Sequence, residues 1–194
     1  MSVVNKWYVV TGGPSSGKTT VIDGLAALGY KTHPEAARMV IDKAAASGLT
    51  VQQLRADERS FQERVFEAML DREAKLDRQI VNIFDRGLGD SLGYLNSYGW
   101  AASRPMQNAW RNVRYGAVFL LEPLEEFTQD YARTEGAKFA TEIHDHLEAA
   151  YRHLGHQPIL VPKMSPSKRI QFILERINGL QSQAEVEDGA EGNT

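Results

Sequence analysis

Short apolar runs alternate along the chain with longer segments in which apolar residues recur every three to four positions. Runs of this kind are typical of buried strands, and the longer segments are typical of amphipathic helices. Strands that alternate with helices favour a parallel sheet covered by helices on both faces. The pattern therefore predicts an α/β fold with strands over residues 7–11, 28–33, 80–85, 116–121 and 158–162.

The segments between these runs predict the helices. Their apolar spacing indicates helices over 20–28, 34–47, 51–79, 90–98, 103–113, 125–132, 137–154 and from Ser165 or Ser167 to 180. In the helix over 51–79, the stripe expected to be buried comprises Leu54, Phe61, Val65, Met69, Leu76 and Ile80. Residues 181–194 are acidic and nearly free of large apolar groups, so we expect a disordered tail after one domain over 1–180.

Bulk composition narrows the class of protein. A length of 194 residues with 42% hydrophobic content suits one globular domain. The net charge of −3 gives no global basic field, which argues against nucleic-acid binding. No apolar run approaches the roughly 20 residues that span a bilayer, and no secretory signal begins the chain. Together with the absence of cysteine, these features predict a cytoplasmic protein and leave its oligomeric state undetermined.

The histidines predict no metal site. His144 and His146 are two positions apart, so on a helix they point in different directions. We therefore interpret them as surface or lid-edge residues, because a ligand set needs convergent geometry.

The octet at 12–19 matches G-x-x-x-x-G-K-[ST], and it lies between a predicted strand and a predicted helix. In such a loop the glycines let backbone N–H groups converge on one anion, and the helix N-terminus adds a partial positive charge. Lys18 is expected to reach the β- and γ-phosphates, and the Thr19 hydroxyl to bind Mg²⁺. The nucleoside triphosphate is thus predicted to bind Gly12, Gly13, Pro14, Ser15, Ser16, Gly17, Lys18, Thr19 and Thr20.

Two charged residues end the third predicted strand. Asp85 stands where a magnesium-binding acid belongs, although an acid there can also cap the next turn. Arg86 follows at the carboxyl edge of the sheet, where open α/β sheets bind ligands. Its guanidinium could hold a substrate oxygen or phosphate, or it could form a structural ion pair. We predict a catalytic role for both residues and substrate contact for Arg86.

A second pair lies after the second predicted strand. Glu35 could accept a proton from a substrate hydroxyl, but an acid in the first turn of a helix is also favoured by the dipole alone. Arg38, one turn on, shares a face with Glu35 and either binds substrate or pairs with that acid.

The stretch around 125–140 is predicted to be a lid. Arg133 would close over the transferring phosphoryl group, with Asp130 and Glu135 orienting it. The alternative is an exposed, charged junction between two helices.

These motifs stand in a fixed order along the chain. The series is the phosphate loop, Pro34-Glu35-Ala36-Ala37-Arg38, Phe84-Asp85-Arg86-Gly87, Asp90-Ser91, Asp130-x-x-Arg133-x-Glu135 and Val161-Pro162. It resembles the small AAA-type ATPase or kinase-like P-loop domain family related to the nicotinamide riboside kinase part of bacterial NAD-biosynthesis regulators. The resemblance covers about residues 6–180.

The resemblance implies a P-loop kinase-like three-layer sandwich whose five-stranded parallel sheet has the order 2-3-1-4-5. It also places the nucleotide base near residues 162–168. The Asp85-Arg86-Gly87 triplet is similar to the Asp-Arg-Ser element of deoxynucleoside kinases, with Gly87 in place of the serine. No helical lid domain follows the core, so a hexameric unfoldase is not expected.

The sequence thus predicts an ATP- and Mg²⁺-dependent phosphotransferase acting on a small hydroxylated metabolite, such as a nucleoside or nucleotide precursor. GTP is the second choice of nucleotide, because the chain lacks a guanine-binding Asn/Thr-Lys-x-Asp element. The alternatives are an ATP- or GTP-binding switch that recruits a partner or acidic lipid, and a simple NTP hydrolase. A kinase requires Glu35 and Arg86 to face a cavity, whereas a closed cleft with the two residues paired would favour the switch.

Overall fold

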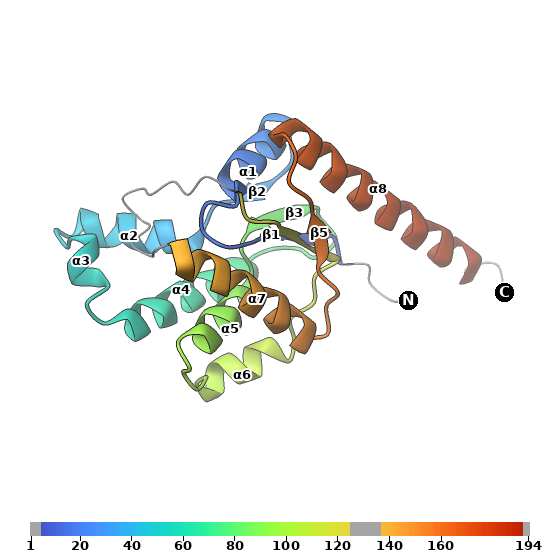
Figure 1. Ribbon diagram of the computed structural model, residues 1–194. Helices are drawn as coiled ribbons and strands as arrows, with labels where there is room; N and C mark the ends of the chain where they lie inside the picture. The colour runs from blue at the N-terminus through green and yellow to red at the C-terminus, as the bar shows by residue number, and fades with distance from the viewer. Residues whose placement is uncertain (1–4, 125–136, 192–194) are drawn as a thin grey trace.

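All five predicted apolar runs form strands of one parallel sheet in the computed structural model, which describes residues 5–124 and 137–191 (Figure 1). The strands are β1 (Trp7–Thr11), β2 (Thr32–His33), β3 (Asn82–Asp85), β4 (Ala117–Leu121) and β5 (Ile159–Val161). Their order is β2-β3-β1-β4-β5, and every neighbouring pair is parallel. The predicted α/β class and strand order are therefore confirmed.

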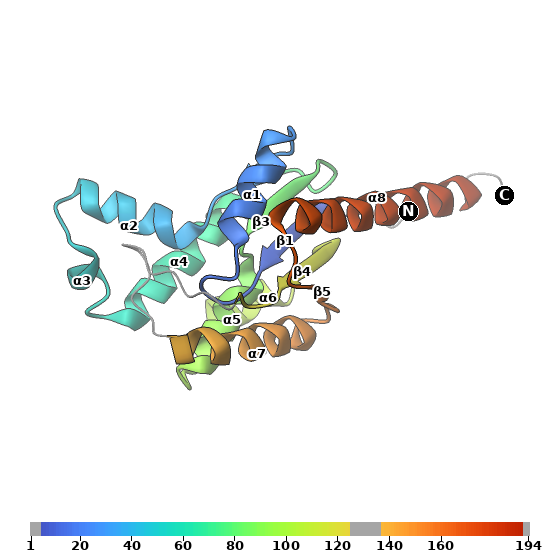
Figure 2. The ribbon, with the colours of Figure 1, turned by 45° about the horizontal axis from the view of Figure 1, so that its top comes forward.

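Helices cover both faces of this sheet. They are α1 (Lys18–Ala27), α2 (Ala36–Ala46), α3 (Val51–Leu54), α4 (Glu58–Glu73), α5 (Leu88–Ser97), α6 (Arg104–Trp110), α7 (Ala137–His153) and α8 (Pro166–Glu191). Figures 1 and 2 show α1 and α8 on one side of the sheet and α4 to α7 on the other, with α2 and α3 projecting away from α8.

Strand side chains point alternately to the two faces of the sheet, so the hydrophobic core has two parts, one on each face. In β1, Tyr8 and Val10 pack with α1 and α8, while Trp7 and Val9 pack with the helices on the opposite face. Side chains on a strand point alternately to its two faces, so a continuous apolar strand is what a sheet buried on both sides requires. This packing holds the carboxyl ends of the strands at one edge.

Two glycines let α5 and α7 approach closely. A Cβ built on Gly89 would lie 2.5 Å from a ring carbon of Tyr151, and one on Gly93 would lie 2.8 Å from a side-chain carbon of Leu147. Since real side chains cannot approach so closely, these positions require glycine, and the close contact fixes α7 against the helix that follows β3.

Three sequence predictions need correction. The predicted helix over 51–79 is two helices, because the Asp57 side chain accepts a hydrogen bond from the Ser60 amide and starts α4 anew. Ile80, expected in the buried stripe, is 51% exposed because α4 ends at Glu73. The last helix, expected to end at Leu180, continues to Glu191.

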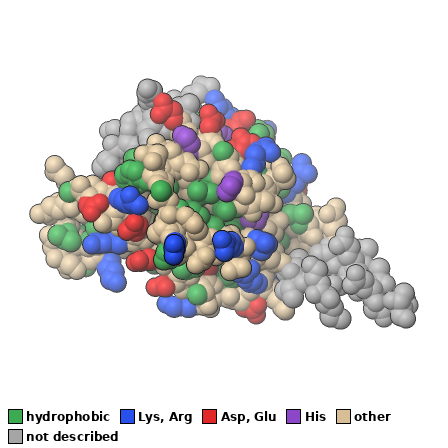
Figure 3. All heavy atoms as spheres, turned by 90° about the horizontal axis from the view of Figure 1, so that it is seen from below, with side chains coloured by type: hydrophobic (Ala, Val, Ile, Leu, Met, Phe, Trp, Pro, Cys, Tyr) green, Lys and Arg blue, Asp and Glu red, His purple; other side chains and the backbone are tan. Residues whose placement is uncertain are grey.

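The remaining surface carries both signs of charge. The face shown in Figure 3 has basic and acidic side chains intermingled with apolar ones. Within 5–124 and 137–191, no helix has the length and apolar character needed to cross a bilayer. Of the lid expected at 125–140, residues 125–136 lie outside the described residues and 137–140 belong to α7.

A buried acid behind the sheet generates a stability prediction. Glu73 is 8% exposed and accepts a hydrogen bond of 2.8 Å from the Tyr115 hydroxyl. Burial raises the pKa of Glu73 from 4.5 to about 7. The folded protein therefore binds this proton more tightly than the unfolded chain, and the resulting stabilisation is lost as pH rises through the folded pKa.

Relative to Glu73→Gln, the wild-type protein should lose about 2 to 3 kcal/mol of unfolding free energy between pH 5 and pH 8. Urea unfolding at the two pH values measures this difference. The exposed Glu67→Gln is the matched control from the same helix and should track the wild type. Parallel pH profiles for wild type and Glu73→Gln would show that Glu73 is not a raised-pKa acid.

Candidate active site

The phosphate loop curls tightly between β1 and α1. Gly12 has φ of +145°, and a Cβ there would lie 2.8 Å from both the Leu121 carbonyl oxygen and the Ser16 hydroxyl. Gly17 has φ of +84° and is the N-cap of α1, and Ser15 also has a positive φ of 58°. These left-handed positions turn the backbone around one centre, which is the geometry of an anion cradle.

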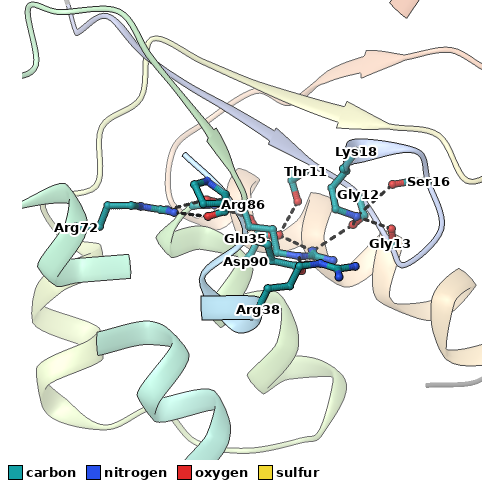
Figure 4. A network of polar contacts seen from close by, with 12 residues as sticks. Thr11, Gly12, Gly13, Ser16, Lys18, Glu35, Arg38, Arg72, Arg86 and Asp90 are labelled. Carbon is teal, nitrogen blue, oxygen red and sulfur yellow. Dashed lines mark hydrogen bonds and ion pairs between the residues drawn. The ribbon is translucent and has the colours of Figure 1, made fainter. Parts of the chain in front are cut away.

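The Lys18 side chain folds back over this loop (Figure 4). Its ammonium donates hydrogen bonds to the carbonyls of Gly12 (3.0 Å) and Gly13 (2.8 Å), with the Ser16 hydroxyl at 3.4 Å. Burial, and then the charge of Arg86, lowers the pKa of Lys18 to about 7. Negative charge beside the ammonium would favour its charged form, so the residue is suited to hold a phosphate.

The N-terminus of α1 points into the same region. In the described part of the chain no side chain caps this helix. Thr19 and Thr20 are exposed within its first turn, so their hydroxyls are open to a ligand. Uncapped amides and the helix dipole favour an anion here.

Asp85 ends β3 directly beside the strand that enters the loop. It pairs in register with Val10 of β1 and is almost completely buried. Its Oδ1 atom has no hydrogen-bond partner among the described residues. Burial, together with the charge of Glu35, raises the pKa of Asp85 to about 7.

An unpartnered carboxylate oxygen fits a cation. Mg²⁺ in phosphotransfer sites is held by one or two carboxylates, waters and substrate phosphates rather than by a full protein cage. The described residues accordingly show no cluster of three or more His, Asp or Glu side chains that could hold a metal. Asp85 and Thr19 therefore remain the predicted metal residues.

Arg86 is the buried cation at the centre of the site (Figure 4). Its Nε donates to Glu35 at 2.6 Å, and its Nη1 donates to Asp90 at 2.9 Å and to the Gly12 carbonyl at 3.2 Å. The guanidinium carbon also lies over the Tyr94 ring, 5.3 Å from its centroid. Its backbone φ of +66° is costly for any residue other than glycine, so the surrounding contacts must stabilise this conformation.

Glu35 forms the other half of this ion pair. It is the N-cap residue of α2, and its Oε2 also lies 3.5 Å from Nε of Arg38. Burial alone would raise the pKa of Glu35, but the charges of Arg86 and Lys18 outweigh it and lower the pKa to about 2. Glu35 is therefore ionised at neutral pH, and both ion-pair alternatives of the sequence analysis are present in the structure.

Asp90 organises the site, a role that the sequence analysis did not assign. Its Oδ1 accepts hydrogen bonds from the Thr11 hydroxyl (2.6 Å) and Arg86 (2.9 Å). Its Oδ2 accepts from the Gly87 amide (3.0 Å) and the Tyr151 hydroxyl (2.6 Å). Arg86 and Gly87 lie four and three residues from Asp90 in the sequence, whereas Thr11 and Tyr151 come from distant elements.

Arg72 supports the strained backbone at the end of β3. Its guanidinium donates to the carbonyls of Pro34 (2.9 Å) and Arg86 (3.2 Å) and lies 5.0 Å from the Phe84 ring centroid. Because it joins the segments that follow β2 and β3, Arg72 fixes their relative position.

The structure explains the glycine after Arg86. A Cβ on Gly87 would lie 2.7 Å from the Tyr115 hydroxyl and 2.8 Å from a methyl group of Val9. The Tyr115 hydroxyl is itself held, since it accepts a hydrogen bond from the Leu88 amide at 2.9 Å. A serine therefore has no room at position 87.

A small pocket opens beside these charged groups, with a cavity volume of about 60 Å³. Both Glu35 and Arg86 line it, so their ion pair does not close the cleft. The lining is Pro14, Glu35, Ala37, Arg38, Arg55, Phe61, Gln62, Val65, Met69, Arg86, Asp90, Ser91 and Tyr94. Pro14 belongs to the phosphate loop, so the pocket adjoins the predicted nucleotide site. Arg133 lies outside the described residues.

Comparison with known families matches residues 7–169 to a family described as an AAA domain. No curated protein sequence matches this chain. Solved structures do match in fold.

Deoxyadenosine kinase from M. mycoides, solved with dCMP and dCDP, has a TM-score of 0.61 at 14% identity, over 90% of this chain and 99% of its own. Shikimate kinase from Aquifex aeolicus has a TM-score of 0.55 at 20% identity, over 89% and 96%. The NadR protein in complex with NR has a TM-score of 0.65 at 16% identity, over 91% of this chain and 51% of NadR. This chain therefore spans about half of NadR, and these likenesses establish the fold.

The four hydrogen bonds of Asp90 generate a prediction about stability. Asp90→Asn should lower the unfolding free energy by about 3 kcal/mol, because it leaves the buried Arg86 charge with one fewer carboxylate. Urea unfolding at pH 7 measures the loss. The exposed Asp71→Asn is the control and should change stability by less than about 0.5 kcal/mol. Equal stability of the two variants would contradict the organising role of Asp90.

Proposed function

The chain belongs to the AAA-domain family and has the P-loop kinase fold, and from this premise we propose that it is an ATP- and Mg²⁺-dependent kinase of a small hydroxylated metabolite. The observation that carries the proposal is the pocket next to the phosphate loop, which both Glu35 and Arg86 line. A kinase needs a second site within reach of the γ-phosphate, and the place of this pocket beside Pro14 of the phosphate loop supports such a role. The family match over residues 7–169 confirms the family resemblance seen in the motif series.

The residues have distinct roles in this proposal. The loop amides and Lys18 bind the triphosphate, and Thr19 and Asp85 hold Mg²⁺. Mg²⁺ held there would neutralise negative charge on the phosphates. Arg86 lies between the loop and the pocket, where its positive charge can stabilise negative charge on a transferring group. Arg133 is proposed to add a further positive charge from the lid.

Glu35 is proposed to position the acceptor rather than to deprotonate it. With a pKa lowered to about 2, its carboxylate is a weak base but a good hydrogen-bond acceptor. A hydroxyl bound to Glu35 would be oriented toward the γ-phosphate. In a loose phosphoryl-transfer transition state the nucleophile needs little activation, so orientation suffices.

The walls of the pocket favour an acceptor with a ring. Phe61, Val65 and Met69 give one apolar side, and Tyr94 contributes an aromatic ring. The Gln62 side chain, buried and hydrogen-bonded to Glu58 at 2.8 Å, supplies a fixed polar group. Together these features support a nucleoside or nucleotide precursor as the acceptor, in keeping with the ligands named for the deoxyadenosine kinase and NadR structures.

One observation favours the switch alternative. Glu35 and Arg86 already neutralise each other, as a purely structural ion pair would. A switch protein would bind nucleotide at the same loop and use it to order a segment that recruits a partner. The open pocket beside the pair weighs toward the kinase, and the acceptor experiment distinguishes the two functions.

The experiment is a panel of nucleosides, vitamin-like ribosides and phosphorylated sugars, each incubated with Mg²⁺ and either ATP or GTP. Product mass shows phosphate addition, and we expect it with ATP and a riboside. ADP released without a phosphorylated acceptor would indicate a hydrolase. Tight nucleotide binding without turnover would contradict the kinase and indicate a switch.

Lys18→Ala tests the phosphate site in the same assay. It should reduce turnover roughly a hundredfold or more, the equivalent of about 3 kcal/mol of lost electrostatic stabilisation. The exposed Lys43→Ala is the matched control and should retain wild-type turnover. Near-normal turnover by Lys18→Ala would rule out this mechanism.

Glu35→Gln tests the acceptor site. It should lower kcat/KM for the acceptor about a hundredfold because the oriented carboxylate is lost. Binding of Mg–ATP, measured by calorimetry, should change little because Lys18 and the loop are intact. Glu63→Gln, at a half-exposed position that pairs with Arg59 of the same helix at 3.6 Å, is the control.

The pH profile separates the two roles of Glu35. A pKa lowered to about 2 keeps the carboxylate ionised at all working pH values, so its titration should leave no acidic limb above about pH 4 in the wild-type rate. An acidic limb near pH 6 that Glu35→Gln abolishes would show that Glu35 is a general base.

A further inference from the structure

Arg169, in the first turn of α8, is 2% exposed although its neighbours Ser167 and Lys168 are exposed. The site described above does not use it. A buried arginine normally pairs with a carboxylate or binds a ligand, because leaving its donors unsatisfied is costly. Its contacts are of a different kind.

The guanidinium donates to three backbone carbonyls from three segments. Nη1 bonds to Ser16 of the phosphate loop at 2.6 Å, Nε to Pro162 after β5 at 3.1 Å, and Nη2 to Glu122 after β4 at 3.2 Å. The planar fork of an arginine is suited to such divergent acceptors, and a lysine ammonium cannot reproduce it. Arg169 therefore joins the phosphate loop to the ends of two strands.

The bond to Ser16 has a consequence for the loop. In a trans peptide the carbonyl and the following N–H point in opposite directions. Holding the Ser16 carbonyl on Arg169 thus aims the Gly17 amide away from Arg169. A Cβ on Gly17 would lie 3.4 Å from Nη1 of Arg169, so the guanidinium packs against this peptide. Since Gly17 caps α1, its amide belongs to the anion cradle.

The strand ends that Arg169 joins are also tied to each other. The Glu122 amide donates to the Val161 carbonyl at 3.1 Å, and the Lys163 amide donates to the Glu122 carboxylate at 3.2 Å. Arg169 therefore joins the phosphate loop to two strand ends that hydrogen bonds already hold together.

We propose that Arg169 is a positioning residue for nucleotide phosphates, which it serves by orienting the Ser16–Gly17 peptide of the phosphate loop. The inference rests on the proposed function only in requiring that this loop binds a polyphosphate. It requires no particular acceptor and no turnover. The residue acts through the loop, and its effect is on affinity for the phosphate chain.

Calorimetric titration of Mg–ATP and of Mg–tripolyphosphate, which lacks the base, tests the proposal. Arg169→Lys should weaken both ligands about tenfold and Arg169→Met somewhat more, since hydrogen bonds from a charged group are lost. An equal loss of affinity for both ligands would locate the effect at the phosphates. Arg176→Met is the matched control, because Arg176 is exposed on the same helix and stacks on Phe172, and it should bind both ligands as the wild type does.

Thermal unfolding of each variant separates positioning from simple support of the fold. A lowered unfolding temperature with unchanged affinity for both ligands would overturn the inference. A loss of affinity for Mg–ATP alone would also overturn it, because the effect would then lie at the base. Arg169→Lys keeps a positive charge and provides the measurement if Arg169→Met does not fold. If the wild type does not bind Mg–ATP, both the proposed function and this inference are overturned. If the wild type binds Mg–ATP, and Arg169→Lys and Arg169→Met bind it equally well, only the inference is overturned.

Discussion

The Arg86 guanidinium is buried at the end of β3 with two carboxylates, those of Glu35 and Asp90, and the Gly12 carbonyl around it. A buried charge without partners is strongly destabilising, so every element that supplies a partner is held in place. Those partners come from the phosphate loop, the start of α2 and the first turn of α5. One ion-pair network therefore positions the loop, the pocket wall and the strained backbone of Arg86 together.

Most of the fold was predictable from the sequence, because a strand buried on both faces of the sheet appears as a continuous run of apolar residues. In β1 the residues from Trp7 to Val10 are all apolar and buried, and the strand leads through Thr11 straight into the glycine-rich loop. The errors arose where local hydrogen bonds compete with periodicity. Asp57 restarts a helix inside a pattern that continues across it, because its side chain accepts a hydrogen bond from the Ser60 amide.

The site was predictable only in part, because its polar contacts join distant residues. The Glu35–Arg38 pair follows from a spacing of three on one helix. Nothing in the sequence indicates that Tyr151 meets Asp90 or that Arg169 reaches Ser16, since these contacts depend on how α7 and α8 pack on the sheet. Sequence motifs identified residues of the phosphate loop and of the pocket lining, and tertiary packing supplied the residues that hold them.

The central claim is that Lys18 rests on loop carbonyls that it exchanges for phosphate oxygens when a nucleotide binds. A crystal structure with Mg²⁺ and a non-hydrolysable ATP analogue tests this most directly. The account predicts that the Lys18 ammonium leaves Gly12 and Gly13 for the β- and γ-phosphates, while Arg86 keeps Glu35 and Asp90 beside the pocket. An analogue bound elsewhere, with Lys18 still on the two carbonyls, would contradict it.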